Sequence, residues 1–224
     1  MKKLFLILIL IFSSINITAQ SKERFAKPVD EAVNDVSLKV FRDSLIQTVK
    51  QKDKKQLISA LDKNIKVSFG TDSGIQDFRK FWNLDSPQTK LWDELLLVLE
   101  NGGSFTVEGK DKTFCAPYLF LNFPEDLDAF TYNAIFGDNV NLREKPNLSS
   151  KVVTQLSYNV VKIDFENSVT STTDPNKYIW TKINTLGDKT GYVSADFVRS
   201  PIDYRACFQK INGSWKMTAF VAGD

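Results

Sequence analysis

The amino-acid sequence predicts an α+β host domain, with helices packed on an antiparallel sheet, into which a small all-β barrel is inserted. Apolar residues recur at helical spacing before residue 131, and a strong hairpin pattern follows residue 200. A hairpin alone is only marginally stable in water, so those last strands need the sheet of the earlier segment. We therefore predict a host domain made of residues 24–130 and 201–224, with the barrel at residues 131–200.

Four segments predict the helices of the host. Asp53 and Gln56 have the spacing of a capping box and predict the start of a short second helix. Ser73 and Gln76 have the same spacing and predict a third helix that contains Ile75, Phe78, Phe81 and Trp82. A fourth helix is predicted between Ser86 and Asn101, because Ser-Pro precedes its apolar residues and Gly-Gly follows them. The first helix follows Asp30 and is predicted to bury one apolar stripe, formed by Val33, Val36, Val40, Phe41, Leu45 and Val49.

Four segments predict the strands of the host. Residues 65–69 alternate apolar and polar side chains, and residues 113–121 are rich in strand-forming residues, with Pro117 indicating an edge or a bulge. Residues 204–211 and 215–221 flank an Asn-Gly turn and form the hairpin pattern.

The composition permits a well-packed core and argues against binding to nucleic acid. Apolar residues make up 42% of the 224 residues and aromatic residues 12%. The chain has 29 Lys and Arg against 27 Asp and Glu, and without Lys2 and Lys3 the balance becomes 27 against 27. A surface for nucleic acid would need a clustered excess of basic residues, which the chain lacks.

Residues 1–20 have the pattern of a secretory signal peptide. Lys2 and Lys3 precede an apolar run from Leu4 to Phe12, and small residues follow up to Ala19. The run is too short to span a bilayer, so we predict no membrane span in the mature chain. The protein is therefore expected to be exported, to the periplasm or the cell exterior.

Two cysteines, Cys115 and Cys207, lie on predicted strands on either side of the barrel segment. An even number of cysteines in an oxidising compartment predicts a disulfide, with two buried free thiols as the alternative. The bond would join the two halves of the interrupted host.

The barrel segment resembles the bacterial SH3-type domain. The resemblance rests on Val140-Asn-Leu-Arg143 with a nearby proline, on Trp180 at the start of a late strand, and on Gly191-Tyr-Val at the last strand. The segment from Asp164 to Lys177 is longer than the usual loop of that family. The resemblance implies an SH3-like barrel that binds a cell-wall peptide or a protein partner.

Five residues are the candidates for a ligand groove on this barrel. Tyr158, Trp180 and Tyr192 could form its aromatic wall, and Asn141 and Arg143 could reach the same ligand. Trp180 could equally belong to the barrel core. Trp82 and Trp92 lie on apolar helical faces and are predicted to be core residues.

Two helices, a strand, further helices and the terminal strand Gly213-Ser-Trp-Lys-Met-Thr-Ala-Phe are the basis of a resemblance of the host to the α+β folds of nuclear transport factor 2-like and cystatin-like proteins. The whole chain resembles exported SH3-domain proteins of Bacteroidetes. The second resemblance implies an envelope location, with peptidoglycan or an envelope protein as the partner. It supplies no catalytic residues.

The sequence contains no histidine, so Ser-His and Cys-His nucleophile pairs and histidine metal sites are excluded. We predict a binding module without catalytic residues, cofactor or metal. Two alternatives stay open: an enzyme that uses a carboxylate such as Asp62 or Asp77 in a host pocket, and a structural envelope protein. The acidic loop residues Glu125, Asp126 and Asp128 could hold a cation, although a solvated loop is the simpler interpretation.

Overall fold

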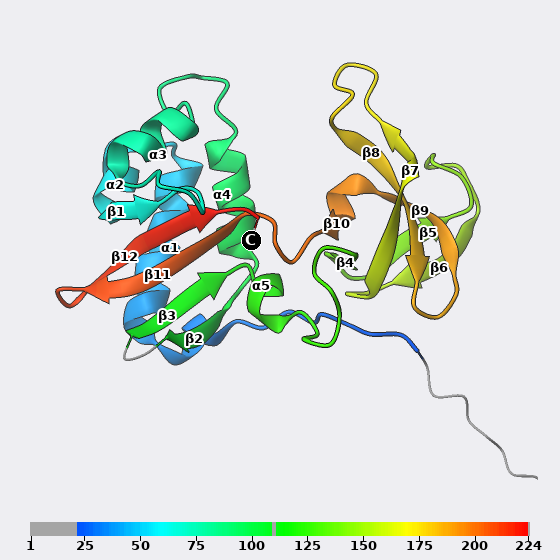
Figure 1. The fold of residues 1–224 in the computed structure, drawn as a ribbon, viewed down its shortest axis with the longest axis horizontal. Coiled ribbons are helices and arrows are strands. Elements are labelled where there is room, and N and C mark those ends of the chain that lie inside the picture. Colours follow the sequence, from blue (N-terminus) through cyan, green and yellow to red (C-terminus); the bar gives the residue numbers. More distant parts are fainter. Residues whose placement is uncertain (1–21, 109–110, 224) are drawn as a thin grey trace, which may run out of the picture.

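The computed structural model describes residues 22–108 and 111–223, and these residues form two separate β-sheets (Figure 1). The predicted signal peptide lies outside the described residues. The host sheet has the strand order β1-β12-β11-β3-β2, and the barrel sheet has the order β10-β4-β7-β8-β9-β5-β6. The α+β fold with an inserted all-β barrel is therefore confirmed.

The host elements come from both ends of the chain. They are η1 (Glu31–Asn34), α1 (Val36–Lys50), α2 (Lys54–Ala60), β1 (Leu61–Lys66), α3 (Ile75–Phe81), α4 (Leu91–Glu100), β2 (Ser104–Glu108), β3 (Asp111–Ala116), α5 (Leu119–Asn122), β11 (Arg205–Ile211) and β12 (Ser214–Val221). The barrel elements lie between α5 and β11. They are β4 (Tyr132–Ile135), β5 (Val140–Arg143), β6 (Val152–Leu156), β7 (Val160–Thr170), β8 (Tyr178–Thr185), β9 (Thr190–Ser194), η2 (Ala195–Phe197) and β10 (Val198–Arg199).

Helices cover one face of the host sheet, and the core lies between the two layers (Figure 1). Successive side chains of a strand point to opposite faces, so Phe114 and Phe208 reach the helices while their neighbours Thr113 and Gln209 reach the other face. The predicted core residues Trp82 and Trp92 are buried in this layer. In the part of the chain that the structure describes, the opposite face carries no helical layer and is bordered by the short helix α5.

The predicted apolar stripe of the first helix is correct at its C-terminal end, where Leu45 and Val49 are buried, and wrong at its N-terminal end. Val36 and Val40 are 76% and 63% exposed, and the buried side of α1 carries Leu38, Arg42 and Leu45 together with Val49. Arg42 can face the core because both of its terminal nitrogens donate to the Asp30 carboxylate, each at 2.6 Å. A count of apolar residues could not identify this part of the buried face, because one of its residues, Arg42, is charged.

Several element boundaries also differ from the prediction. The first strand ends at Lys66 rather than spanning residues 65–69, and it pairs with β12 in parallel, whereas an antiparallel sheet was expected. The predicted strand 113–121 stops at Ala116, since proline has no amide N–H to extend the strand pairing, and the chain continues into α5. Strand β2 was not predicted.

The terminal hairpin and the Asp53 cap of α2 are both present, with Asp53 accepting from the Gln56 amide.

The barrel leaves the host sheet between two strands that are direct neighbours. Strand β3 pairs with β11 in antiparallel register, with Cys115 opposite Cys207. These two cysteines form a disulfide that joins residues 92 positions apart in the sequence. The predicted pairing is therefore present.

An apolar cluster joins the barrel to the host. It contains Tyr118 and Leu119 from the host side and Ala134 and Val160 from the barrel, with Ala26 from the N-terminal segment. The ring of Tyr118 stacks on Phe136 at a centroid distance of 5.4 Å. Burial raises the pKa of the Tyr118 hydroxyl well above its ordinary value, because the ionised form would lose its water.

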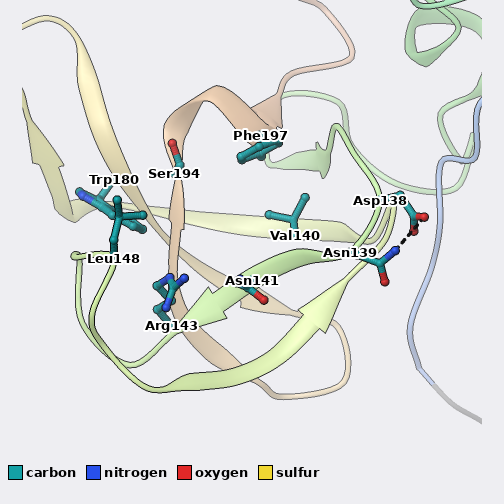
Figure 2. A pocket seen from close by; sticks show the side chains of 9 residues that line it. All are labelled: Asp138, Asn139, Val140, Asn141, Arg143, Leu148, Trp180, Ser194 and Phe197. Atoms are coloured by element: carbon teal, nitrogen blue, oxygen red, sulfur yellow. Dashed lines mark hydrogen bonds between the residues drawn. The ribbon is translucent and has the colours of Figure 1, made fainter.

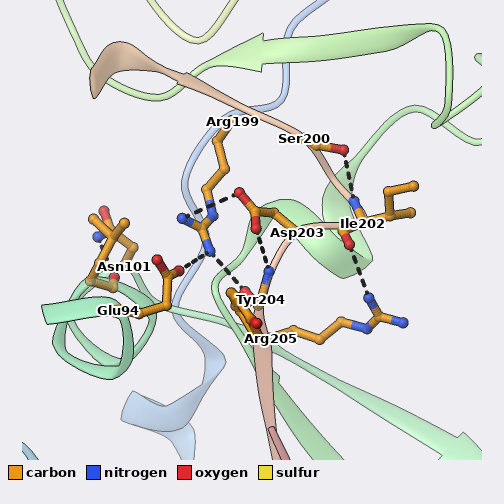
Figure 3. Close-up of polar contacts among 9 residues, drawn as sticks. Glu94, Asn101, Arg199, Ser200, Ile202, Asp203, Tyr204 and Arg205 are labelled. Atoms are coloured by element: carbon orange, nitrogen blue, oxygen red, sulfur yellow. Dashed lines mark hydrogen bonds and ion pairs between the residues drawn. The ribbon is translucent and has the colours of Figure 1, made fainter. Parts of the chain in front are cut away.

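A buried cation lies at the same junction. The Arg199 side chain is 6% exposed, and its guanidinium donates to the Glu94 carboxylate at 2.9 Å and to the Tyr204 carbonyl at 2.8 Å (Figure 3). Asp203 lies 3.8 Å from the same guanidinium. Because Arg199 ends strand β10 and Glu94 lies on α4, this contact fixes the barrel against the helical layer.

Replacing Asp30 by asparagine is expected to lower the free energy of unfolding by about 2 kcal/mol at neutral pH, because the buried Arg42 loses a charged acceptor. Burial alone would raise the pKa of Asp30, but the hydrogen bonds and charge of Arg42 hold it below its usual 3.8. The contribution is therefore complete above pH 3.8 and lost as the pH falls through the lower folded pKa. Urea unfolding of both proteins across the acid range measures this difference, and a gap that stays constant with pH would contradict the assignment.

Candidate functional site

The outer face of strands β5, β9 and β8 carries most of the predicted groove residues. Trp180 lies opposite Ser194 in the β8 and β9 pairing, and Arg143 lies opposite Tyr192 in the β5 and β9 pairing. The alternate residues Leu142, Ile183 and Val193 point inward and are fully buried. Because successive side chains of a strand point to opposite faces, the apolar residues fill the interior and the polar and aromatic residues lie on the exterior.

A hollow of about 200 Å³ lies on this outer face (Figure 2). It is shallower and smaller than the pockets that enclose drug-sized ligands, which measure roughly 300 to 1,000 Å³. Its lining consists of Asp138, Asn139, Val140, Asn141, Arg143, Leu148, Trp180, Ser194 and Phe197. A groove of this size fits one or two side chains of an extended ligand.

The apolar part of the lining is exposed. Leu148 is 78% exposed and lies in the loop after β5, and Phe197 is 43% exposed and lies on η2. Together with the partly buried Trp180 they surround the hollow (Figure 2). A ligand that covers these side chains removes apolar surface from water, which makes the free energy of binding more favourable.

The polar part of the lining is held in place by local hydrogen bonds. The Arg143 guanidinium donates to the Ser150 carbonyl at 2.8 Å, and Asn141 accepts from the Gln155 amide at 3.3 Å. Asp138 accepts from Asn139 at 2.9 Å at the far end of the hollow. The lining therefore contains both a cation, on the side of Trp180 and Leu148, and a carboxylate on the other side (Figure 2).

Three of the five predicted groove residues, Asn141, Arg143 and Trp180, line the hollow. Tyr158 lies elsewhere, in the turn between β6 and β7 with a φ of 59°, and its carbonyl accepts from Ala26. Tyr192 is on the same outer face but outside the lining, and the Lys182 ammonium lies 4.5 Å from its ring centroid.

Leu148 and Phe197 are the groove residues that sequence reasoning missed. A leucine within a loop of Pro, Asn and Ser has no core to join, and this was the available signal for Leu148. Phe197 follows β9 in the short 3₁₀ helix η2, a turn that the alternation of the preceding strand does not indicate.

The other candidate carboxylates have local partners. Asp126 accepts two hydrogen bonds of 2.6 Å from Arg24, and Asp128 caps the turn that follows it. Asp62 and Asp77 accept from nearby backbone amides.

Within residues 22–108 and 111–223, no group of three or more metal-binding side chains is found. Over the same ranges, no helix has the length and apolar character needed to cross a membrane.

The barrel matches a known family. Residues 138–199 match the family model described as the bacterial SH3 domain. No curated protein matches the chain. A solved chain named Rd1NTF2_05, a variant with five substitutions, is weakly similar, with a TM-score of 0.29 and 13% identity over 85% of this chain and 99% of that chain. All residues that line the groove therefore lie within residues 138–199, the segment that matches the bacterial SH3 domain model.

Proposed function

We propose that this protein is an exported, non-enzymatic binding protein whose barrel holds a peptidoglycan stem peptide in the groove around Trp180. The observation that carries the proposal is the pairing of exposed apolar residues, Leu148 and Phe197, with the guanidinium of Arg143 in one hollow. The bacterial SH3 family match supports a binding role.

The apolar wall supplies the affinity. Each square ångström of apolar surface that a ligand removes from water contributes about 25 cal/mol, and aromatic anchors dominate such contacts. Trp180 forms the base of the wall, and Leu148 and Phe197 present the exposed surface. A short aliphatic side chain of a peptide has the dimensions of this hollow.

The guanidinium supplies the selectivity. Arg143 donates to one backbone carbonyl, and a guanidinium has five N–H donors in a planar fork that matches a carboxylate. Stem peptides are extended, contain alanine side chains and carry free carboxylates. The arrangement of an apolar hollow beside a cation fits that chemistry.

Export is supported by two observations. Residues 1–20 have the charge and hydropathy pattern of a signal peptide, and Cys115 and Cys207 form a disulfide. The carboxylate enzyme alternative has no such support, because the fully buried side chains of the described residues include no Asp or Glu.

A double substitution, Trp180→Ala with Phe197→Ala, is expected to weaken binding of a soluble stem peptide at least tenfold, because the apolar wall is removed. Isothermal titration calorimetry with a purified muropeptide measures the effect. Ile179→Ala is the matched control, since Ile179 is 42% exposed on the same strand but points to the opposite face.

Equal binding by the parent and the double variant would contradict the proposal. Absence of muropeptide binding, with Trp180-dependent capture of an envelope protein instead, would assign the groove to a protein partner. Loss of binding in the Ile179→Ala control would indicate a fold defect in β8 rather than a groove contact.

A further inference from the structure

We infer that the uncovered face of the host sheet is a second binding site, and that its ligand is a neutral oligosaccharide. The site is a cleft of about 540 Å³ on the side of the sheet opposite the helical layer. Its volume lies within the range of pockets that enclose small-molecule ligands. The inference is independent of the groove on the barrel, with which the cleft shares no lining residue.

Four strands form the floor of the cleft. Thr106 of β2 pairs with Thr113 of β3, and Gln209 of β11 donates to the Thr113 hydroxyl at 2.7 Å. Thr218 of β12 continues the floor on the other side of β11, and its hydroxyl donates to the Cys207 carbonyl at 3.2 Å. The floor therefore combines four neutral side chains that donate and accept hydrogen bonds with an apolar part, formed by the Cys115–Cys207 disulfide, Ala219 and Val221.

Two segments raise walls above this floor. The first is the loop of residues 66–73, which folds back on β1 through a bridge between Lys66 and Ser73. The second is α5, which contributes Phe120 and Leu121. Without these walls the face would be the ordinary solvated side of an antiparallel sheet, but here it is enclosed on two sides.

The walls present aromatic rings that are held by a buried arginine. Arg205 is 4% exposed, and its guanidinium lies 5.0 Å from the Phe69 ring centroid and 4.3 Å from the Phe120 ring centroid. One of its nitrogens donates to the Gly223 carbonyl at 2.7 Å (Figure 3 shows its contact with Ile202). Phe69 nevertheless stays 56% exposed, so part of its ring is available to a ligand.

This lining selects the chemical class of the ligand. Three charged side chains line the cleft: Lys66, Arg205 and Asp72. Arg205 is buried against the two aromatic rings, and the other two are opposite in sign, so the cleft does not favour an anion or a cation strongly. The hydroxyl and amide floor disfavours a purely apolar ligand, whose binding would leave those groups without partners. A sugar ring has hydroxyl groups on its edge and an apolar C–H face, which match the floor and the Phe69 ring.

Titration of the isotope-labelled protein with three tetrasaccharides tests the inference. The probes are the neutral tetramers of N-acetylglucosamine and of glucose, and the acidic tetramer of galacturonic acid. At least one neutral tetramer is expected to shift the amide resonances of Thr113, Gln209 and Thr218 at millimolar concentration. If neither neutral tetramer does so, or if only the acidic tetramer does, the inference is wrong.

Phe69→Ala and Thr106→Val are expected to weaken that binding at least tenfold and severalfold, respectively. Phe130→Ala is the matched control, because Phe130 is 70% exposed and lies outside the cleft. The amide spectrum of each variant reports whether it is folded. Unchanged affinity in folded Phe69→Ala protein would overturn the assignment. Trp180→Ala should leave oligosaccharide binding intact, which separates this site from the barrel groove.

Discussion

Replacing both Cys115 and Cys207 with alanine is expected to lower the free energy of unfolding of the host by about 3 to 4 kcal/mol. The disulfide joins β3 and β11 across a sequence separation of 92 residues, so it removes much of the freedom of the unfolded chain. The chain-entropy model gives about 4.7 kcal/mol for a loop of that length, and the folded barrel within the loop reduces the value. Denaturant unfolding followed by tryptophan fluorescence measures the loss.

A reductant provides the control for this prediction. It should destabilise the parent protein and leave the double alanine variant unchanged, because only the parent has a bond to reduce. Three of the four tryptophans, Trp82, Trp92 and Trp215, are buried in the host core, so their fluorescence reports on host unfolding. Equal stability of the parent with and without reductant would contradict the predicted contribution.

Replacing Arg199 with methionine is expected to destabilise the protein by about 3 kcal/mol and to loosen the barrel from the host. The substitution leaves the Glu94 carboxylate, whose side chain is 26% exposed, without its cation, and it leaves the Tyr204 carbonyl without a donor. Removing one partner of a buried ion pair costs about 3 to 5 kcal/mol, and the partial exposure of Glu94 places this pair at the lower end. Denaturant unfolding measures the stability, and limited proteolysis near Ser200 measures the loosening.

A double-mutant cycle with Glu94→Gln isolates the pair. The two substitutions together should cost less than the sum of their separate effects, because each removes the same contact. The exposed pair of Arg79 and Asp85 is the matched control, and Arg79→Met should destabilise the protein much less than Arg199→Met, because water screens the exposed pair. Additive effects of Arg199→Met and Glu94→Gln would show that the pair contributes no coupling energy.

The parts of the fold that local chemistry determines were predictable from the sequence. The Asn-Gly turn identified the terminal hairpin, and the barrel segment was identified from Val140-Asn-Leu-Arg143, Trp180 and Gly191-Tyr-Val. The burial of Arg42 was not predictable, because its partner Asp30 lies before the helix and only the folded chain brings the two together. The short helix α5 was read as a strand, since Leu-Phe-Leu fits either structure and the turn at Pro117 decides between them.

The groove was predictable only in part, for a similar reason. Trp180 and Arg143 lie on regular strands, so alternation places them on one face. Leu148 and Phe197 lie in a loop and in a short 3₁₀ helix, whose direction depends on the packing of the barrel. The cleft on the host sheet was not foreseen, because β2 was missed and the loop of residues 66–73 was read partly as a strand.

The pairing of β3 with β11 has a consequence for the history and the engineering of this chain. Ala116 and Ala206 lie opposite each other at the point where the chain leaves and re-enters the host sheet, so the register of the host does not depend on what lies between them. In a simpler ancestor the same two strands could be joined by an ordinary connecting loop. Exchange of the barrel for another module would keep this strand pairing, but it would remove the contact of Arg199 with Glu94 and the packing of Ala134 and Val160 in the cluster of Tyr118.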